Sequence, residues 1–213
     1  MRVTRTFAFL DLSGFTAYHA QQGDEQASQV LGELRSAIRN AAERRGVRLT
    51  KWLGDGAMLS GLEPGVVIAC ALEAQYTLEH QYECDLPLRA GICQGKVIMF
   101  EGDDYVGVAV NQASKLCDQA HSGQTLVAGI SRDDLPFWAD AVHQRFLDPE
   151  QLGPQVEVFE TSPIQEKHMG KDPVCGLPLA ESVVPEELWE GAYPFCSVQC
   201  LAHWRAAHHG GTL

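Results

Sequence analysis

The sequence predicts an α+β domain in which helices pack on one face of a mainly antiparallel sheet. The main observation is the order of elements, since strand-like and amphipathic helical segments follow one another as β-α-β-β-α-β-β-α-β. Composition supports a folded domain, because 45% of residues are hydrophobic and 21% are charged. A chain of 213 residues has room for one sizeable core and a small extra module.

The first elements are a strand, a long helix and a hairpin. Phe7–Leu12 is an apolar strand that runs into the glycine-containing turn Ser13–Thr16. The helix closes at Gly46, and its apolar residues recur at spacings of three and four: Ala27, Leu31, Leu34, Ile38 and Ala41. The hairpin consists of Val47–Leu53, the turn Gly54-Asp55-Gly56, and Ala57–Leu62.

A second helix begins at Pro64 and extends to about Tyr82. The next strand alternates through Leu86, Leu88, Ala90 and Ile92, and Gly95 is expected to turn it into a further strand, Val97–Phe100. The remaining expected elements are a tight turn at Gly102-Asp103-Asp104, a helix over Val108–Ala120, and strands at Thr125–Ala128 and Val156–Phe159.

The net charge of −12 excludes several classes of partner. Neither a nucleic acid nor an anionic membrane surface would be attracted to such a protein, whereas divalent ions can screen a single nucleotide from it. No apolar run is long enough to span a bilayer, and Phe7–Leu10 is too short for a signal peptide. We therefore expect a cytoplasmic protein whose seven cysteines are thiols or metal ligands.

The composition changes near the C-terminus. The stretch Thr161–Lys171 is polar, and three cysteines follow it. We therefore expect a large domain at 1–162, a linker at 163–171 and a small second domain at 172–213.

Two acidic residues, Asp11 and Asp55, lie at turns that end strands. If the two strands are neighbours, their carboxylates converge at one end of the sheet, where they can hold Mg²⁺. The backbone amides of Leu12–Thr16, which include Gly14, Phe15 and Thr16, can bind a phosphate at the helix N-terminus. The alternative is that both aspartates are only turn residues or helix caps.

Five segments resemble, in order and spacing, the class III adenylate/guanylate cyclase catalytic domain. The resemblance covers about residues 5–160 and implies the nucleotide cyclase fold, a ferredoxin-like antiparallel sheet with helices on one face. The segments are Phe9–Thr16, Lys51–Gly56, Leu88–Ile92 with Gly95, Asp104–Gly107 and Val110–Leu116.

The resemblance implies that Asp11 and Asp55 bind Mg²⁺ or Mn²⁺, with Leu12 lending its carbonyl. Lys51 and Asp104 match the pair that reads the base. An ammonium donor suits adenine N1 and a carboxylate suits the 6-amino group, whereas guanine reverses this pattern. ATP is therefore the expected substrate. The expected reaction forms 3′,5′-cyclic AMP and pyrophosphate by two-metal catalysis.

The resemblance also implies catalytic roles on the third helix and a second protomer. Asn111 matches the residue that orients the ribose, and Lys115 occupies the position of the family's transition-state arginine. Lysine lacks the planar, two-pronged donor set of arginine, so we expect a slow enzyme, with a rate loss on the order of 10²–10³. In this family the metal aspartates and the base-reading pair come from opposite protomers, which implies a homodimer.

The C-terminal cysteines resemble the YHS domain and its TRASH-like relatives. Their mark is one cysteine, a gap of about twenty residues, and Cys-x-x-x-Cys, matched by Cys175, Cys196 and Cys200. Cys196 and Cys200 are four residues apart on an expected short helix, and His203 continues that face. With Cys175 they can bind Zn²⁺ or Cu(I) in a tetrahedral site, with His203 or His208 as fourth ligand. The alternative is three reduced thiols in a small core.

The sequence therefore supports three candidate functions for this protein. The first is a homodimeric adenylate cyclase whose C-terminal module binds metal and tunes or localises the enzyme. The second is a weak or inactive nucleotide-binding dimer that senses metal or redox state. The third is a metal-handling protein that uses the large domain only to dimerise.

Overall fold

The computed structural model describes residues 2–82, 84–100, 104–146 and 157–209, with the side chains of all of these except 143–146 and 209. Its main sheet has the strand order β2-β3-β1-β4-β6-β8-β7, and β5 pairs with β4. These strands are β1 (Arg2–Leu12), β2 (Arg48–Trp52), β3 (Gly56–Gly61), β4 (Leu88–Phe100), β5 (Asp104–Val106), β6 (Thr125–Ala128), β7 (Ala139–Phe146) and β8 (Glu157–Pro163). Two small sheets follow, formed by β9 (Met169–Lys171) with β10 (Pro178–Ala180) and by β11 (Trp189–Glu190) with β12 (Tyr193–Pro194).

Strand β1 lies between β3 and β4 and is antiparallel to both. Among the described strands of the main sheet, only β4 and β6 run parallel. The prediction of a mainly antiparallel sheet is therefore confirmed. The register places Asp11 opposite Gly56 of β3 and Arg89 of β4, which brings three motif segments to one end of the sheet.

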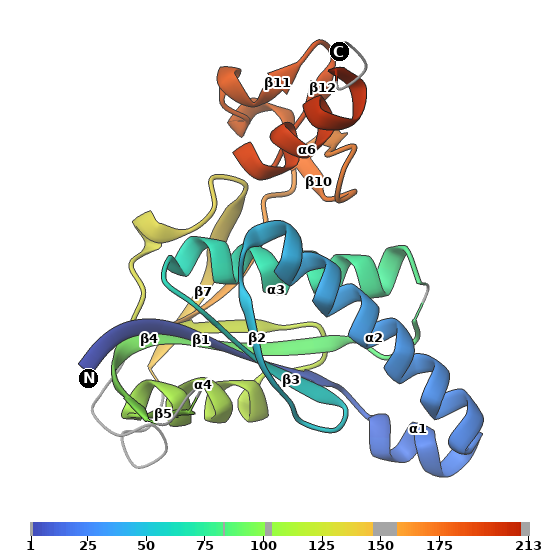
Figure 1. The fold of residues 1–213 in the computed structure, drawn as a ribbon, viewed down its shortest axis with the longest axis vertical. Coiled ribbons are helices and arrows are strands. Elements are labelled where there is room, and N and C mark those ends of the chain that lie inside the picture. Colours follow the sequence, from blue (N-terminus) through green and yellow to red (C-terminus); the bar gives the residue numbers. More distant parts are fainter. Residues whose placement is uncertain (1, 83, 101–103, 147–156, 210–213) are drawn as a thin grey trace.

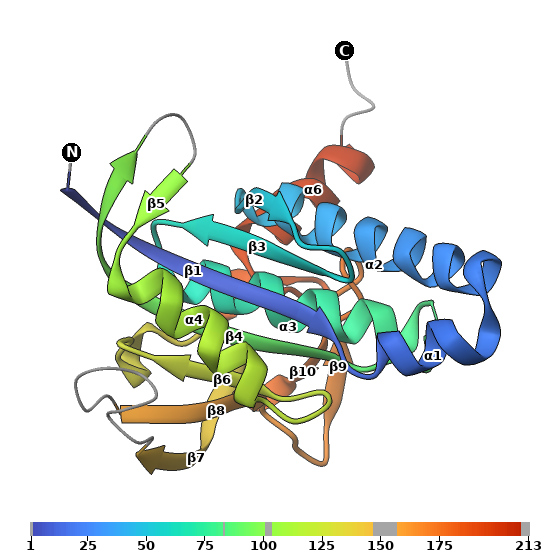
Figure 2. The same cartoon turned by 90° about the horizontal axis from the view of Figure 1, so that it is seen from below.

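The helices cover both faces of this sheet, so the prediction that they lie on one face is wrong. Figure 1 shows α2 and α3 on one side and α4 on the other, and Figure 2 looks onto the α4 side. Gly91 of β4 gives the physical reason, because a Cβ there would lie only 2.1 Å from the Cys117 amide nitrogen. The backbone of α4 therefore packs directly on the strand. The helices are α1 (Phe15–Gln22), α2 (Asp24–Arg45), α3 (Pro64–His80), α4 (Val108–Gln119) and α6 (Val198–His209).

Several predicted boundaries also change. The long helix is preceded by α1, and Gly23, with φ +84°, separates the two. Strand β4 continues through Gly95 without a turn. Glycine is required there for packing instead, because an added Cβ would lie 2.8 Å from the Cβ of Ala109. Strand β7 was not predicted. Of the predicted turn Gly102-Asp103-Asp104, the first two residues lie outside the described residues and the third begins β5.

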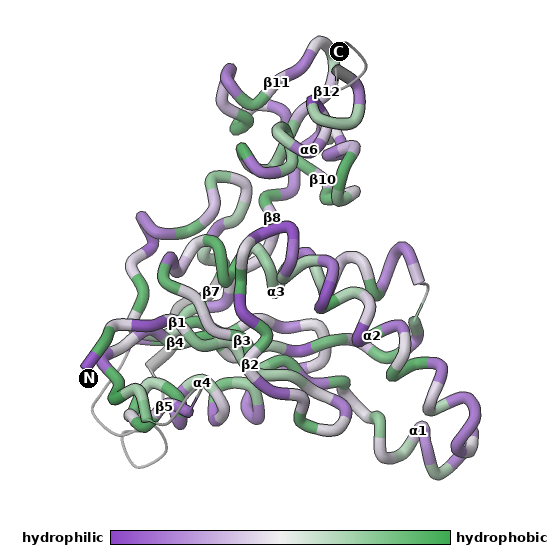
Figure 3. Tube along the Cα trace, viewed as in Figure 1, coloured by the Kyte–Doolittle hydropathy of each residue, from purple (hydrophilic) through white to green (hydrophobic). Residues whose placement is uncertain are grey.

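The C-terminal part lies against the ends of α2 and α3 rather than on the sheet (Figure 1). Of the predicted polar linker, the first residues belong to β8 and the last to β9. Cys175, Leu177 and Phe195 are buried in the same apolar cluster as Leu34 and Ile68 of the two helices. Hydropathy follows this packing, because apolar residues run through the sheet while α2 alternates between polar and apolar residues (Figure 3). No described helix is both long and apolar enough to cross a bilayer.

Candidate active site and cysteine cluster

Asp11 and Asp55 meet at one end of the sheet, as the sequence predicted. Asp11 is the last residue but one of β1, and Asp55 lies in the turn between β2 and β3. The Leu12 amide donates to the Asp55 carbonyl at 3.2 Å, which fastens the turn to the end of β1. Gly56 permits this approach, because a Cβ there would lie 2.4 Å from the Leu10 carbonyl oxygen.

The two carboxylates interact electrostatically. Burial raises the pKa of Asp55 and the neighbouring Asp11 raises it further, whereas Arg89 lowers it. A bound cation would relieve this repulsion. Carboxylates are hard oxygen donors, which suit Mg²⁺ or Mn²⁺, and Leu12, whose carbonyl was the third expected ligand, directly follows Asp11 in β1.

Arg89 is a member of this site that sequence reasoning missed. From β4, its Nε and Nη2 donate to Oδ2 of Asp11 at 2.9 and 2.6 Å, and its Nη1 donates to the Asp118 carbonyl at 3.2 Å. The available signal was a cation within the short apolar motif Leu88–Ile92. The site therefore contains a planar two-pronged donor next to its carboxylates.

The predicted phosphate-binding segment leads into α1. The amides of Leu12 and Ser13 already donate, to the carbonyls of Asp55 and Pro87. Gly14, with φ +83°, precedes the helix, and Phe15 and Thr16 lie in its first turn, where amides have no partner within the helix. If the segment binds an anion, the amides of residues 14–16 would therefore be the ones that do so.

Lys51 and Asp104 form an ion pair, although 53 residues separate them in sequence. Lys51 comes from β2 and Asp104 from β5, and both side chains are about half exposed, at 50% and 55%. Strand β5 packs toward the sheet, since the Tyr105 ring lies 5.1 Å from that of Phe7 in β1. One protomer thus supplies both members of the pair.

Asn111 and Lys115 are exposed and lie one turn apart on α4. Residues at this spacing share one helix face. Both side chains therefore lie on the exposed face of α4.

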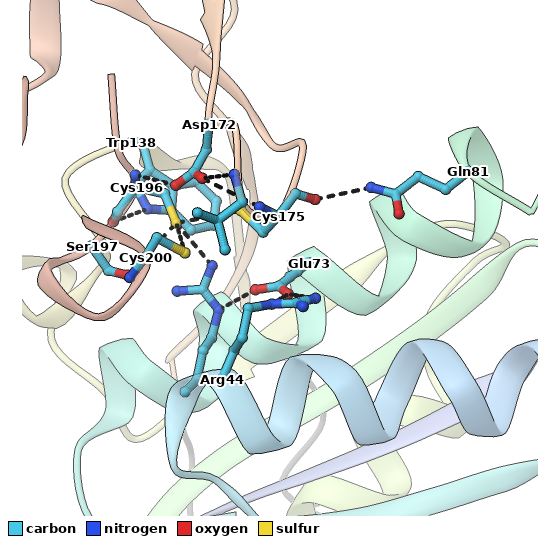
Figure 4. A network of polar contacts seen from close by, with 11 residues as sticks. Arg44, Glu73, Gln81, Trp138, Asp172, Cys175, Cys196, Ser197 and Cys200 are labelled. Atoms are coloured by element: carbon cyan, nitrogen blue, oxygen red, sulfur yellow. Dashed lines mark hydrogen bonds and ion pairs between the residues drawn. The ribbon is translucent and has the colours of Figure 1, made fainter. Parts of the chain in front are cut away.

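The three C-terminal cysteines also come together as predicted. The Cys196 sulfur lies 3.6 Å from the sulfurs of both Cys175 and Cys200, and all three residues are buried (Figure 4). A tetrahedral site with metal–sulfur bonds of about 2.3 Å separates its sulfurs by about 3.8 Å, so this spacing suits a thiolate-bound metal. All seven cysteines of the chain are free.

The fourth ligand group next to the three sulfurs is Asp172 rather than His203, which was expected from the sequence. Ligand atoms of Asp172 and the three cysteines lie within 4.8 Å of one another. His203 is exposed, because the buried side of α6 follows Cys200, Leu201 and Trp204 instead. His208 is also exposed, stacked on Trp204 at 3.7 Å between ring centroids.

Cys196 lies before α6 rather than within it. Ser197 stands between this cysteine and the helix, and its hydroxyl accepts from the Cys200 amide at 3.2 Å. The two sulfurs therefore meet through the loop that leads into the helix.

The Asp172 carboxylate organises the loops of the cluster. Its Oδ1 accepts from the amides of Val174 and Cys175 at 2.8 and 3.2 Å, and its Oδ2 accepts from the Cys196 amide at 2.7 Å. Burial raises the pKa of Asp172. Hydrogen bonds from Cys175 and Cys196 lower the pKa of Cys200, whereas hydrogen bonding to Cys196 and Cys200 raises the pKa of Cys175.

The cluster contacts the larger part of the protein through three side chains. The Arg45 guanidinium donates to the Cys196 sulfur at 3.2 Å and to Glu73 at 2.6 Å. The Trp138 indole donates to the Cys196 carbonyl at 3.1 Å, and Gln81 donates to the Cys175 carbonyl at 2.9 Å. None of these residues was singled out from the sequence.

No family model matches the chain. Among curated proteins, it is 28% identical to an adenylate cyclase of Streptomyces coelicolor, over 81% of this chain and 46% of that protein. It is 31% identical to a pH-sensitive adenylate cyclase of Mycobacterium tuberculosis, over 69% of this chain and 37% of that protein. The chain thus spans less than half the length of these relatives.

Solved structures show the same fold. The guanylyl cyclase Cya2 superposes with a TM-score of 0.67 at 20% identity, over 84% of this chain and 98% of that one. The adenylyl cyclase CyaB from P. aeruginosa superposes with a TM-score of 0.62 at 20% identity, over 79% of this chain and 98% of that one. Motif order, fold and curated relatives together identify the chain as carrying a class III adenylate/guanylate cyclase catalytic domain.

Proposed function

We propose that this protein is an adenylate cyclase that converts ATP into 3′,5′-cyclic AMP and pyrophosphate. The observation that carries the proposal is the meeting of Asp11 and Asp55 beside Arg89. The curated relatives named adenylate cyclase favour ATP, and the Lys51–Asp104 pair has the donor and acceptor that adenine requires.

Each residue has a defined task in this proposal. Asp11 and Asp55 hold divalent ions, which when bound supply charge neutralisation and activate the ribose 3′-hydroxyl. Arg89 moves from Asp11 to the triphosphate, and the amides of residues 14–16 bind its terminal phosphate. The ribose 3′-oxygen then attacks the α-phosphorus in line with the departing pyrophosphate, so that one P–O bond forms as the other breaks.

We further propose that the active form is a homodimer with two composite sites. Asn111 and Lys115 are exposed on α4, so they can act on nucleotide held by a second copy. The apolar side chains near the start of the same helix are also exposed in the single chain: Ile98, Met99, Phe100, Val106 and Val108. Burial of such a patch between two copies would stabilise the dimer.

The test is a cyclase assay with Mn²⁺ or Mg²⁺ and either ATP or GTP, on wild-type protein and on Asp55→Ala. We expect cyclic AMP from ATP, no comparable product from GTP, and loss of activity in Asp55→Ala. Activity that survives in Asp55→Ala would contradict it.

Composite sites are tested by mixing two inactive variants, Asp55→Ala and Asn111→Ala. Random exchange makes mixed dimers in which one site has both intact halves, so about a quarter of wild-type activity should return. Two variants of the same half, Asp11→Ala and Asp55→Ala, form the control and should regain none. No recovery in the first mixture would contradict the composite sites.

A second candidate is a weak nucleotide-binding dimer, favoured by Lys115 at the arginine position. Nucleotide binding without turnover, in protein whose metal content is verified, would support this candidate over the first.

We also propose that Cys175, Cys196 and Cys200 bind Zn²⁺, with Asp172 adjacent, and that the C-terminal module at 172–213 regulates the cyclase domain at 1–162 from beyond the linker at 163–171. Burial, sulfur spacing and the donor set support a soft divalent ion. The double variant Cys196→Ser, Cys200→Ser should lose the zinc found by elemental analysis, and unchanged zinc would refute the assignment. The free thiols accord with a reducing cytoplasm.

A further inference from the structure

We propose that Arg45 makes the docking of the C-terminal part onto α2 and α3 depend on the metal in the cysteine cluster. The inference rests on the proposed metal site and defines how that site would regulate the cyclase domain. Its basis is one buried guanidinium that contacts both a cluster sulfur and the larger part of the protein.

Arg45 is held on three sides. Its Nε donates to Oε2 of Glu73 at 2.6 Å, its Nη2 donates to the Cys196 sulfur at 3.2 Å, and its guanidinium lies 5.9 Å from the centre of the Trp138 ring. Arg45 is only 7% exposed and Glu73 is fully buried. A buried charge without its partner is strongly unfavourable, so each contact affects where the guanidinium can lie.

The charges around Arg45 favour a further negatively charged partner, which the cysteine cluster can supply. Arg44 also contacts Glu73, at 2.6 Å, so two cations share one carboxylate and leave an excess positive charge. Figure 4 shows Arg44 and Glu73 next to the cysteines. A metal-bound cysteine is a thiolate, so Arg45 would donate to an anion in the loaded cluster and form a charge-assisted bond.

Metal loss would weaken several contacts at once. The Cys196 side chain would no longer be fixed by a metal, while its own backbone carbonyl accepts from Trp138 and its amide donates to Asp172. The Cys175 carbonyl accepts from Gln81 of the chain following α3. Three of the contacts that fasten the C-terminal part therefore involve residues that bind the metal.

Helix α2 gives the docking contact a structural connection to the active site. It has 22 residues, a length of about 33 Å, and it ends at Arg45. Its other end follows Gly23 and α1, and the first turn of α1 contains Phe15 and Thr16 of the proposed phosphate-binding segment (Figure 1). A change in how the C-terminal part holds Arg45 therefore acts on a helix that is joined to this segment through α1.

A cavity of about 270 Å³ lies along the same contact and offers the metal a route. Its lining includes Arg45, Trp138 and Cys196, together with the acidic residues Glu63 and Asp134. Acidic side chains at the wall favour entry of a cation. The metal would then reach the cluster through the docking contact itself.

The experiment is hydrogen–deuterium exchange on the full chain, with Zn²⁺ bound and after removal by a zinc-selective chelator, without nucleotide. We expect amides at the end of α2, around Arg45, to exchange at least about fivefold faster without zinc. Equal exchange rates in the two states, or failure of the chain to bind added Zn²⁺, would overturn the proposal.

Arg45→Lys and Arg44→Lys form a matched pair of variants. Both keep the charge and a contact with Glu73, but only Arg45 reaches the Cys196 sulfur. The zinc-dependent difference in exchange should shrink in Arg45→Lys and persist in Arg44→Lys, with thermal unfolding confirming that both are folded. If the two variants behave alike, Arg45 is not the connecting residue.

A parallel assay with excess Mg²⁺ and ATP asks whether zinc also changes cyclic AMP formation, which we expect to shift severalfold in wild type and less in Arg45→Lys. Exchange is independent of turnover, so the two proposals can fail separately. An inactive protein with zinc-dependent exchange contradicts only the cyclase proposal, whereas an active one without it contradicts only the inference.

Discussion

The two chemical centres of this protein use opposite environments. Asp11 and Lys51 lie at partly exposed positions, with 30% and 50% of their side chains accessible, and Asn111 faces outward. The cysteine cluster is buried, and its Asp172 accepts three backbone hydrogen bonds.

This difference follows from what each centre is proposed to hold. Mg²⁺ retains much of its hydration and a nucleotide must enter and leave, so an open site suits them. A thiolate-bound zinc has only protein ligands in a closed site and contributes to folding. A variant at the first centre should therefore change activity with little change in stability, and variants around the second should act mainly on stability.

The largest effect should come from the open centre. Asp55→Ala removes one of the two carboxylates, and we expect kcat/KM for ATP to fall by about a thousandfold or more while the melting temperature changes by less than about 3 °C. Steady-state assays and thermal denaturation measure the two quantities. Asp133→Ala, an exposed aspartate on the short 3₁₀ helix 132–134, is the control and should leave both unchanged. A large loss of stability in Asp55→Ala would break the comparison.

Around the buried cluster, Glu73→Gln should reduce stability. It leaves Arg44 and Arg45 without their shared carboxylate, which should cost about 3–5 kcal/mol and lower the melting temperature by roughly 10 °C. Denaturant unfolding checks the free energy. Glu79→Gln, exposed on the same helix, should have almost no effect. Equal stability of the two variants would mean that the buried ion pairs contribute little.

Lys115→Arg is a variant of the open centre that should raise activity rather than lower it. Arginine adds a planar two-pronged donor, so we expect kcat to rise about tenfold or more with unchanged stability. Unchanged or lower kcat would show that lysine is not the weak point of the site.

The smallest effect concerns one glycine in the cluster loop. Gly176 has φ +79°, and a Cβ there would lie 2.7 Å from Nε2 of Gln81, so Gly176→Ala should destabilise the protein by about 1–2 kcal/mol. Gly191→Ala, with φ +61° and open space, isolates the backbone effect and should cost less. If the two costs are equal, crowding of the added Cβ against Gln81 does not contribute to the loss of stability.

Local patterns predicted much of the fold. The 3.6-residue period and the closing Gly46 located α2, and the Gly54-Asp55-Gly56 turn located the hairpin that carries Asp55. Gly95 was misjudged because its role depends on a helix distant in sequence, which packs where a side chain would otherwise lie. The placement of α4 on the opposite face follows from that same packing.

By itself, the sequence determined which residue types gather at each centre, because motif order and cysteine spacing are properties of the chain. Only the tertiary structure decided which partners complete them. Arg89 reaches Asp11 through strand register, and Asp172 takes the place expected for His203 because α6 turns that histidine to solvent. Arg45 meets Cys196 across 151 positions, a proximity that no local pattern encodes, because it depends on how separately folded elements pack.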